Sequence, residues 1–228
     1  MKRSWKSRFI YSKQCVKTTW TLRLSLFVSV VLLAWLSGPL WARAVAYSLV
    51  CDEKIVPADA ILIENFDPDY LLFERAQALY KNRLASKVFV PTDAGADGTE
   101  SMVSAGIVEV MSRVAWLERR ETIPVQRGEP ISLNAAYQIL TVLEKQNVRS
   151  VLVVTPGFRS QRSALVYSAV LGRAGIAVSC VPVFGTKTRA TWTTTWHGIQ
   201  EVVEQFAKLQ YYRWYVLPVY GSKERSHS

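Results

Sequence analysis

The run from Val151 to Val154 constrains the fold more than any other stretch of this chain. Its residues, Val-Leu-Val-Val, are all aliphatic and mostly β-branched. A strand of this composition is typical of the middle of a parallel sheet, where both faces of the strand are buried. Thr155-Pro156-Gly157 interrupts the run, and a helical pattern of apolar residues follows as far as Val170. The stretch therefore predicts a strand and the helix that leads away from its carboxyl end.

The same alternation of strand and helix repeats along the chain. Further strands are predicted at 58–64, 87–91, 122–126 and 176–183, and helices at 67–82, 100–117, 132–146 and 195–209. Asp67 and Ser132 are the expected N-caps of two of these helices. Short connections between alternating strands and helices imply right-handed crossovers and a sheet covered on both faces. We predict a Rossmann-like three-layer α/β sandwich with a mostly parallel five-stranded sheet, to which the aromatic tail 210–220 adds an edge strand or, alternatively, a membrane-surface patch.

The basic charge of the chain is concentrated at its N-terminus. The net charge of +10 would suggest a nucleic-acid partner, but residues 1–46 hold eight Lys and Arg and no acid. The remaining residues hold 20 Lys and Arg against 18 Asp and Glu. The predicted folded part is therefore nearly neutral, which removes the main support for nucleic-acid binding.

A membrane anchor explains this charge. The run Leu24–Trp41 is uncharged and 18 residues long, close to the ~20 residues that a membrane-spanning helix needs. Basic residues before such a run place the N-terminus in the cytoplasm and the rest of the chain outside. We predict a single-pass protein of the bacterial inner membrane with a periplasmic C-terminal domain. Ala44-Val45-Ala46 also fits a signal-peptide cleavage site, so removal after Ala46 is the alternative to the uncleaved anchor that we favour.

These features divide the chain into five segments: a cytoplasmic basic segment (1–23), a transmembrane signal anchor (24–46), a tether (47–57), an α/β domain (58–217) and a polar tail (218–228). Cys51 and Cys180 would both lie outside the cytoplasm, where a disulfide is permitted, but the sequence does not decide their redox state. The chain has no CxxC motif or Cys/His cluster, so we predict no metal site and assign no cofactor.

Polar residues that follow the strands gather on one rim of a parallel sheet, where ligands bind in open α/β folds. Arg159 and Arg162 fall in the first turn of the helix after the 151–154 strand, and a bound anion would explain two cations at a positive helix end. Solvation or pairing with nearby acids is the alternative. The other expected ligand-binding residues on this rim are Glu64, Asn65, Asp93, Ser132, Asn134 and Thr155. Glu129 is the candidate catalytic residue, acting as a general acid or base.

Several common catalytic arrangements are absent from the sequence. It has no nucleophile elbow, P-loop or GxGxxG motif, and no histidine placed for a Ser-His-Asp hydrolase. Trp192 and Trp196 are four residues apart, which would put them on one helix face. Packing is the simpler role for this pair, with a sugar platform as the alternative.

Short motifs in the order and spacing of this chain resemble the bacterial YdcF/SanA/ElyC envelope family over about Ala58 to Leu217. The matching residues are Asp59, Ala60, Arg75, Ala78, Leu79, Tyr80, Glu129, Ser132, Asn134, Ala135, Val154, Thr155, Phe158, Arg162 and Glu204. Glu64-Asn65-Phe66-Asp67 and Pro91-Thr92-Asp93 stand where the family has glycine-rich turns, and Arg159 stands where it has a histidine. The chain therefore resembles a divergent member of the family. Because glycine lets a phosphate approach backbone amides, we expect the ligand at those turns to be changed or lost.

The resemblance implies a role in the cell envelope, linked to peptidoglycan, polysaccharide or lipid-carrier metabolism. We therefore expect a membrane-anchored protein of envelope or exopolysaccharide biogenesis that binds or acts on an anionic, phosphate-bearing ligand. A phosphorylated lipid carrier or a glycan is the expected partner. The alternative is a non-catalytic scaffold that binds other components of an assembly complex.

Overall fold

The computed structural model describes residues 19–66, 69–95 and 98–223. The chain divides into two compact units, Met1–Ala42 and Arg43–Ser228. Helix α2 (Trp20–Ser48) begins in the first unit and ends in the second, and it is long and apolar enough to span a membrane. A signal sequence near an N-terminus has the same properties.

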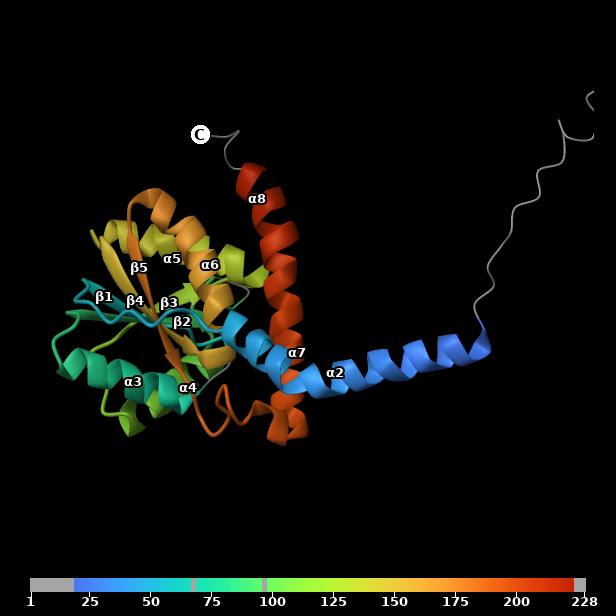
Figure 1. Ribbon diagram of the computed structural model, residues 1–228. Coiled ribbons are helices and arrows are strands. Elements are labelled where there is room, and N and C mark those ends of the chain that lie inside the picture. The colour runs from blue at the N-terminus through green and yellow to red at the C-terminus, as the bar shows by residue number, and fades with distance from the viewer. Residues whose placement is uncertain (1–18, 67–68, 96–97, 224–228) are drawn as a thin grey trace, which may run out of the picture. The chain divides into compact units, whose positions relative to one another are not determined.

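The predicted five-stranded sheet is confirmed, and all of its pairings are parallel (Figure 1). The strands lie in the order β3-β2-β1-β4-β5. Their bounds are β1 Ala60–Ile63, β2 Lys87–Asp93, β3 Glu121–Val125, β4 Ser150–Pro156 and β5 Ala177–Val183. Residues 151–154 of β4 are buried, as their aliphatic composition predicts for a central strand.

Helices cover both faces of the sheet. Helices α3 (Tyr70–Lys81) and α4 (Met102–Val114) lie on one face, and α5 (Ile131–Lys145) and α6 (Ser160–Val170) lie on the other (Figure 1). Each face has its own apolar cluster, built from alternate residues of the same strands: Ile61 and Ile63 point to α3, and Ala60 and Leu62 to α5 and α6. The arrangement is a three-layer α/β domain.

The strand order reverses between β1 and β4. From β1 the chain builds outward to β2 and β3, and it then crosses back to place β4 on the other side of β1. In open α/β sheets this reversal leaves a crevice beyond the carboxyl ends of the two strands, where ligands bind. The residues that follow β1 and β4 are therefore the first to consider for a site.

Two helix caps differ from the expected ones. The cap of α3 is Asp69, whose Oδ1 accepts a hydrogen bond from the backbone N–H of Leu71 at 3.0 Å; Asp67 lies outside the described residues. The cap position of α5 is Pro130, without a side-chain cap, so Ser132 is a residue of the first turn and its prediction as a cap is wrong. Its hydroxyl is used in the site instead.

The C-terminal segment is helical, so the prediction of an edge strand at 210–220 is wrong. Helix α7 (Trp196–Tyr211) continues through a π-helical turn (Tyr212–Val216) into α8 (Leu217–Lys223). Tyr212 and Val216 are buried in the cluster that α5 and α6 form. Trp192 lies in a separate 3₁₀ turn (Trp192–Thr194) and is buried, whereas Trp196 begins α7 and is exposed, so the two do not share a helix face.

A disulfide joins Cys51 to Cys180 of β5. The segment before it is held to the same region, because the N–H of Cys51 donates to Ser160 Oγ at 3.0 Å and the N–H of Gln161 donates to the carbonyl of Leu49 at 3.0 Å. The N–H of Lys54 donates to the carbonyl of Cys180 at 3.3 Å. The first part of the predicted 47–57 tether is thus bonded to the α/β domain.

Candidate functional site

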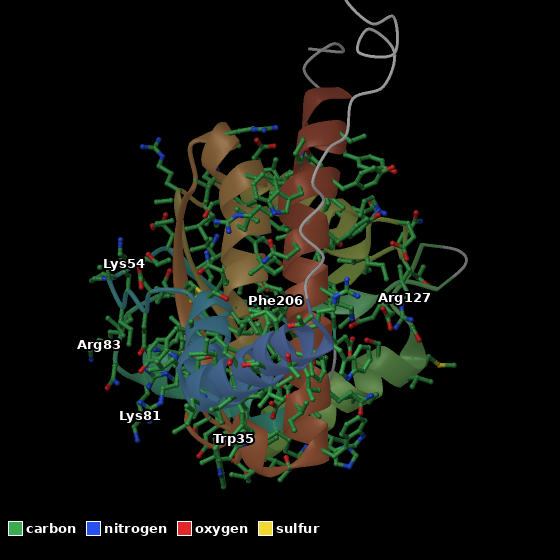
Figure 2. All side chains as sticks on the ribbon, turned by 45° about the vertical axis from the view of Figure 1, so that its right-hand side comes forward. Trp35, Lys54, Lys81, Arg83, Arg127 and Phe206 are labelled. Atoms are coloured by element: carbon green, nitrogen blue, oxygen red, sulfur yellow. A yellow bond between two sulfur atoms is a disulfide. The ribbon has the colours of Figure 1, made fainter. Side chains whose placement is uncertain are left out.

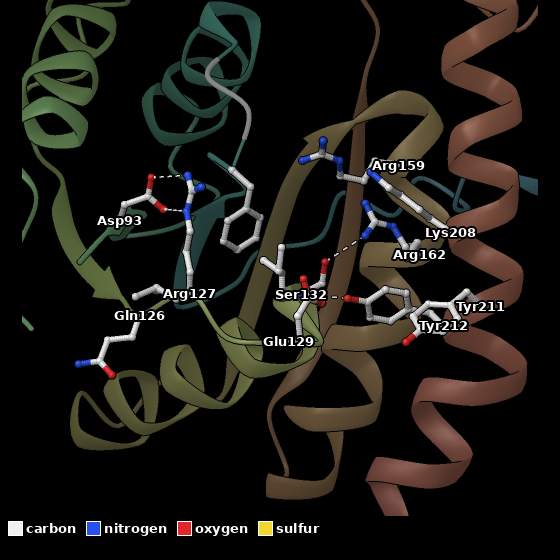
Figure 3. Close-up of a pocket in the computed structure, with 13 residues that line it drawn as sticks. Asp93, Gln126, Arg127, Glu129, Ser132, Arg159, Arg162, Lys208, Tyr211 and Tyr212 are labelled. Carbon is white, nitrogen blue, oxygen red and sulfur yellow. Dashed lines mark hydrogen bonds and ion pairs between the residues drawn. The ribbon is translucent and has the colours of Figure 1, made fainter. Parts of the chain in front are cut away.

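A cleft of about 410 Å³ lies at the carboxyl edge of the sheet (Figure 3). Its volume falls within the range of about 300–1,000 Å³ that small-molecule sites occupy. Predicted site residues from three different connections line it: Asp93, Glu129, Ser132, Arg159 and Arg162. They meet because parallel strands end at the same edge, which is the physical basis on which they were predicted.

Glu64 and Thr155 lie buried beside this cleft rather than lining it. Glu64 directly follows β1 and is 1% exposed. Its Oε2 accepts hydrogen bonds from the hydroxyls of Thr155, at the end of β4, and Ser163, in α6. These bonds satisfy the carboxylate at the β1–β4 junction and fix its position.

Arg162 is held in the wall of the cleft by neutral partners. The residue is 8% exposed, and its Nη1 and Nη2 donate to Ser132 Oγ at 3.0 Å and to Gln205 Oε1 at 3.2 Å. Its guanidinium lies 5.4 Å from the ring centroid of Tyr212. Among the described residues no carboxylate is in ion-pair contact with Arg162, and its Nε has no hydrogen-bond partner.

Burial lowers the pKa of Arg162, and the negative charge of Glu64 partly opposes that shift. The charge of Arg159 lowers the pKa of Arg162 further. An arginine nevertheless keeps its proton under all ordinary conditions. The cleft wall therefore contains a permanent, largely desolvated positive charge.

The C-terminal helix contributes further residues to the site. Tyr212 from the π-helical turn accepts a hydrogen bond through its hydroxyl from the backbone N–H of Ser132, at 3.1 Å. Gln205, Lys208 and Tyr211 come from the same continuous helix, and the last two also line the cleft. π-Helical turns are rare and often occur at functional sites.

Tyr211 and Tyr212 were missed because the helix was expected to end at Leu209, whereas Gln205 and Lys208 were missed although they lie inside the predicted helix. The signal that identifies Gln205 and Tyr212 is a buried stripe at 202, 205, 209, 212 and 216, whose spacing continues the helix without a break. Arg127 and Ser163 were missed as well. Both lie close in sequence to predicted site residues and belong to residue types that are often only surface or helix polar groups.

Asp93 faces an arginine across the outer part of the cleft. Arg127 donates to both of its carboxylate oxygens, from Nε at 2.9 Å and from Nη2 at 2.7 Å. The hydrogen bonds and charge of Asp93 raise the pKa of Arg127. Figure 2 shows Arg127 on the opposite side of the view from Lys54, Lys81 and Arg83, so Arg127 is separate from those basic side chains.

The remaining predicted residues occupy different positions. Glu129 is exposed at the cleft, where a ligand can reach it. Asn65 and Asn134 do not line the cleft: Asn65 is buried with Oδ1 unpartnered among the described residues, and Asn134 Oδ1 accepts from Gln138 Nε2 at 3.2 Å. Glu204 is exposed and pairs with Lys208 at 2.5 Å. That hydrogen bond is the first cause of its lowered pKa.

Tyr167 lies fully buried within electrostatic reach of Glu64, Arg159 and Arg162. Burial, reinforced by the charge of Glu64, raises its pKa well above the usual value. The phenol therefore stays neutral and can act only as a hydrogen-bonding group.

Among the residues that the structure describes, no group of three or more His, Cys, Asp or Glu side chains is placed to hold a metal ion.

What this arrangement can do follows from its charges. It presents cations at the β1–β4 junction and a carboxylate, Glu129, within the same cleft. Such a site can bind an anionic group and offer an acid or base to it.

No protein-family model, curated protein or solved structure matches the chain, so the resemblance to the YdcF/SanA/ElyC family stays a prediction.

Proposed function

We propose that the α/β domain binds a phosphate-bearing ligand in this cleft. The observation that carries the proposal is Arg162, a buried guanidinium hydrogen-bonded only to neutral groups among the described residues. Burying a cation is expensive unless a counter-charge is present, and Glu64 supplies one only at a distance and is itself engaged by two hydroxyls. A bound phosphate would supply the missing charge.

The shape of the site also suits a phosphate. Arginine presents its N–H groups in a planar fork that matches phosphate oxygens. Arg159 and Lys208 line the same cleft and add positive potential beside Arg162. The strand order and the crevice at the β1–β4 reversal are those expected of a Rossmann-like domain, to which we assign the fold.

We assign this domain to the outer side of the bacterial inner membrane, anchored by α2 with the N-terminus in the cytoplasm. The uncharged run 24–41 and the basic residues before it support that orientation. The Cys51–Cys180 disulfide supports it independently, because disulfides persist in oxidising compartments. Ala46 is fully buried, which favours an uncleaved anchor over removal after that residue. A role in envelope or exopolysaccharide biogenesis follows from this location and from the family resemblance.

The role of Glu129 distinguishes an enzyme from a binding protein. It is exposed at the cleft, so it is free to exchange a proton with a ligand held by Arg162. If the protein is an enzyme, we assign the general acid or base role to Glu129 and transition-state charge stabilisation to Arg159 and Arg162. A binding protein would use the same residues without turnover.

A scaffold is the second candidate, and helix α4 favours it. Val103, Val110 and Val114 lie along one face of α4 at helical spacing and are all exposed, as is Trp116 just beyond the helix. Exposed apolar side chains that continue along one face mark interaction surfaces. If the protein is a scaffold, the cleft binds no ligand and α4 binds a partner protein.

The test is a calorimetric titration of inorganic phosphate into the full chain in detergent micelles. Arg162→Met should abolish binding, because it removes the buried charge and keeps a similar side-chain length. Arg119→Met is the matched control, since Arg119 is exposed and does not line the cleft. The proposal would be contradicted if Arg162→Met bound phosphate as tightly as the wild type, or if the wild type bound no phosphate.

The free energy of unfolding of Arg162→Met, measured without ligand, shows whether a loss of binding is due to misfolding. Two lost hydrogen bonds to a charged group cost about 1.5–3 kcal/mol each, and release of a buried charge returns several kcal/mol. The net change in the free energy of unfolding should therefore stay within about 2 kcal/mol. A variant that unfolds outright would show that Arg162 is structural.

A further inference from the structure

The cleft has two chemically different sides. Arg159, Arg162 and Lys208 lie on one side, and the Asp93–Arg127 pair lies on the other (Figure 3). Glu129 lies between them, near Ser132 (Figure 3). A ligand that fills the cleft therefore meets three cations at one end, the Glu129 carboxylate in the middle and the Asp93–Arg127 ion pair at the other end.

A bare phosphate would complement only the cationic side. An ionised carboxylate is an acceptor without donors, so Glu129 repels a second anion and attracts a hydroxyl or amide N–H. The two oxygens of Asp93 are already engaged by Arg127, yet each retains further acceptor capacity. The part of the ligand beyond the phosphate is thus expected to carry several hydrogen-bond donors and no further charge.

An aromatic surface borders the cationic side. Tyr211 lines the cleft and is 50% exposed. Its ring is stacked on that of Tyr215, one helical turn further on, with centroids 5.4 Å apart and an interplanar angle of 24°. Stacking on Tyr215 restrains the Tyr211 ring beside the cleft before a ligand arrives.

We infer that the ligand is a sugar phosphate, whose phosphate binds at Arg159 and Arg162 and whose sugar ring packs against Tyr211 with its hydroxyls toward Glu129. This inference rests on the proposed function and names its substrate class. A pyranose has a face of polarised C–H groups that suits the negative face of an aromatic ring, and its hydroxyls are uncharged donors. A nucleotide would stack equally well but presents fewer donors to the carboxylates.

The experiment compares ligands that share the phosphate and differ in the rest. The full chain in detergent micelles is titrated calorimetrically with inorganic phosphate, with the 1-phosphates of glucose, galactose, mannose and N-acetylglucosamine, and with uridine monophosphate. The same titrations are made with Tyr211→Ala and Tyr211→Phe. Trp214→Ala is the control, because Trp214 is on the same helical segment, is 75% exposed and does not line the cleft.

At least one sugar phosphate should bind about tenfold or more tightly than inorganic phosphate, a difference of about 1.4 kcal/mol. Tyr211→Ala should reduce that affinity to the level of inorganic phosphate and weaken the binding of inorganic phosphate itself by a much smaller factor. Tyr211→Phe and Trp214→Ala should retain the preference. Arg162→Met should abolish binding of both ligands.

The two proposals fail in different ways. If no sugar phosphate exceeds inorganic phosphate, if uridine monophosphate binds more tightly than every sugar phosphate, or if Tyr211→Ala has no more effect than Trp214→Ala, the sugar subsite is refuted and the anion site stands. If sugar phosphates bind equally well to Arg162→Met, or if no phosphate compound binds the wild type, the anion site is refuted and the sugar subsite with it.

Discussion

Removal of the Cys51–Cys180 disulfide should destabilise the domain strongly, because the bond closes most of the chain into one loop. The cysteines are 129 residues apart in sequence. The chain-entropy relation gives about 5 kcal/mol for a loop of that size, and measured effects commonly reach about 2–4 kcal/mol. At about 2–4 °C per kcal/mol for a domain of this length, the melting temperature should fall by roughly 5–15 °C.

A local effect should accompany the global one. Cys51 donates to Ser160 Oγ at 3.0 Å, and Ser160 opens the helix that carries Arg162. Without the cross-link, the segment from Leu49 to Lys54 keeps its backbone and hydroxyl hydrogen bonds to the domain and the ion pair between Glu53 and Arg75 of α3, at 2.9 Å. We therefore expect phosphate affinity to weaken by less than the Arg162→Met loss, since the arginine and its partners remain.

The assay is thermal unfolding of the full chain in detergent, followed by near-UV circular dichroism with and without reductant. Reductant should lower the melting temperature of the wild type and leave that of a Cys51→Ala/Cys180→Ala variant unchanged. Equal melting temperatures for oxidised wild type, reduced wild type and the variant would refute the reasoning. Free thiols at both positions in protein taken directly from cells would refute the extracytoplasmic placement.

Three further predictions concern topology, pH and chemistry. A reporter active only outside the cytoplasm, fused after Ser228, should be active, and the fusion should retain its full-length mass; a cytoplasmic signal contradicts the orientation, and loss of the first 46 residues contradicts the uncleaved anchor. Hydrogen bonds from the backbone N–H of Arg149, and then from Ser150, lower the pKa of Asp59. Because the pKa is lower in the folded state, the extra stability of wild type over Asp59→Asn should be complete above the unfolded pKa of about 3.9 and disappear as the pH falls through the folded value; melting temperatures that keep a constant difference down to low pH would contradict this. Glu129→Gln should retain ligand binding and reduce turnover by about 10²–10⁴-fold if the protein is an enzyme, and a change that affects neither binding nor phenotype would exclude Glu129 from the site.

The sheet could be predicted because its signals are local. Each strand is a short apolar run that a polar or glycine-containing turn interrupts, and each is followed by helical spacing. The predicted strand at 58–64 and the observed β1, Ala60–Ile63, differ only at their ends. Connection length then restricts the topology to parallel crossovers. Nothing about a distant part of the chain is needed for these steps.

Part of the site follows from the same logic. Once the strands are parallel, residues at their carboxyl ends must share an edge, so the sequence alone is enough to place Asp93, Glu129 and Arg162 together. It is not enough to tell which of them are exposed. Asn65 and Glu129 both follow strands, yet one is buried and the other exposed, because neighbouring elements decide what covers each position.

The C-terminal helix shows where local reasoning fails. The tail Tyr-Tyr-Arg-Trp-Tyr-Val is rich in aromatic and β-branched residues, which favour strands when considered alone. It is helical because Tyr212 and Val216 fit the apolar cluster between α5 and α6, a gain from tertiary packing that outweighs local propensity.

The C-terminal helix, of which the part beyond Leu209 was misassigned, also gives Arg162 its environment. Gln205 and Tyr212 lie 43 and 50 positions beyond Arg162, and they hold its guanidinium with a hydrogen bond and a ring face rather than with an acid. A sequence that shows two arginines at a helix start does not reveal whether they are solvated, paired or buried. Because Arg162 is buried among neutral partners, its positive charge lacks a counter-charge in contact with it among the described residues. The function proposed for this chain therefore depends on a C-terminal helix of which only the first part was predicted, and substitutions along α7 that leave the cleft's β1–β4 side intact should still alter ligand binding.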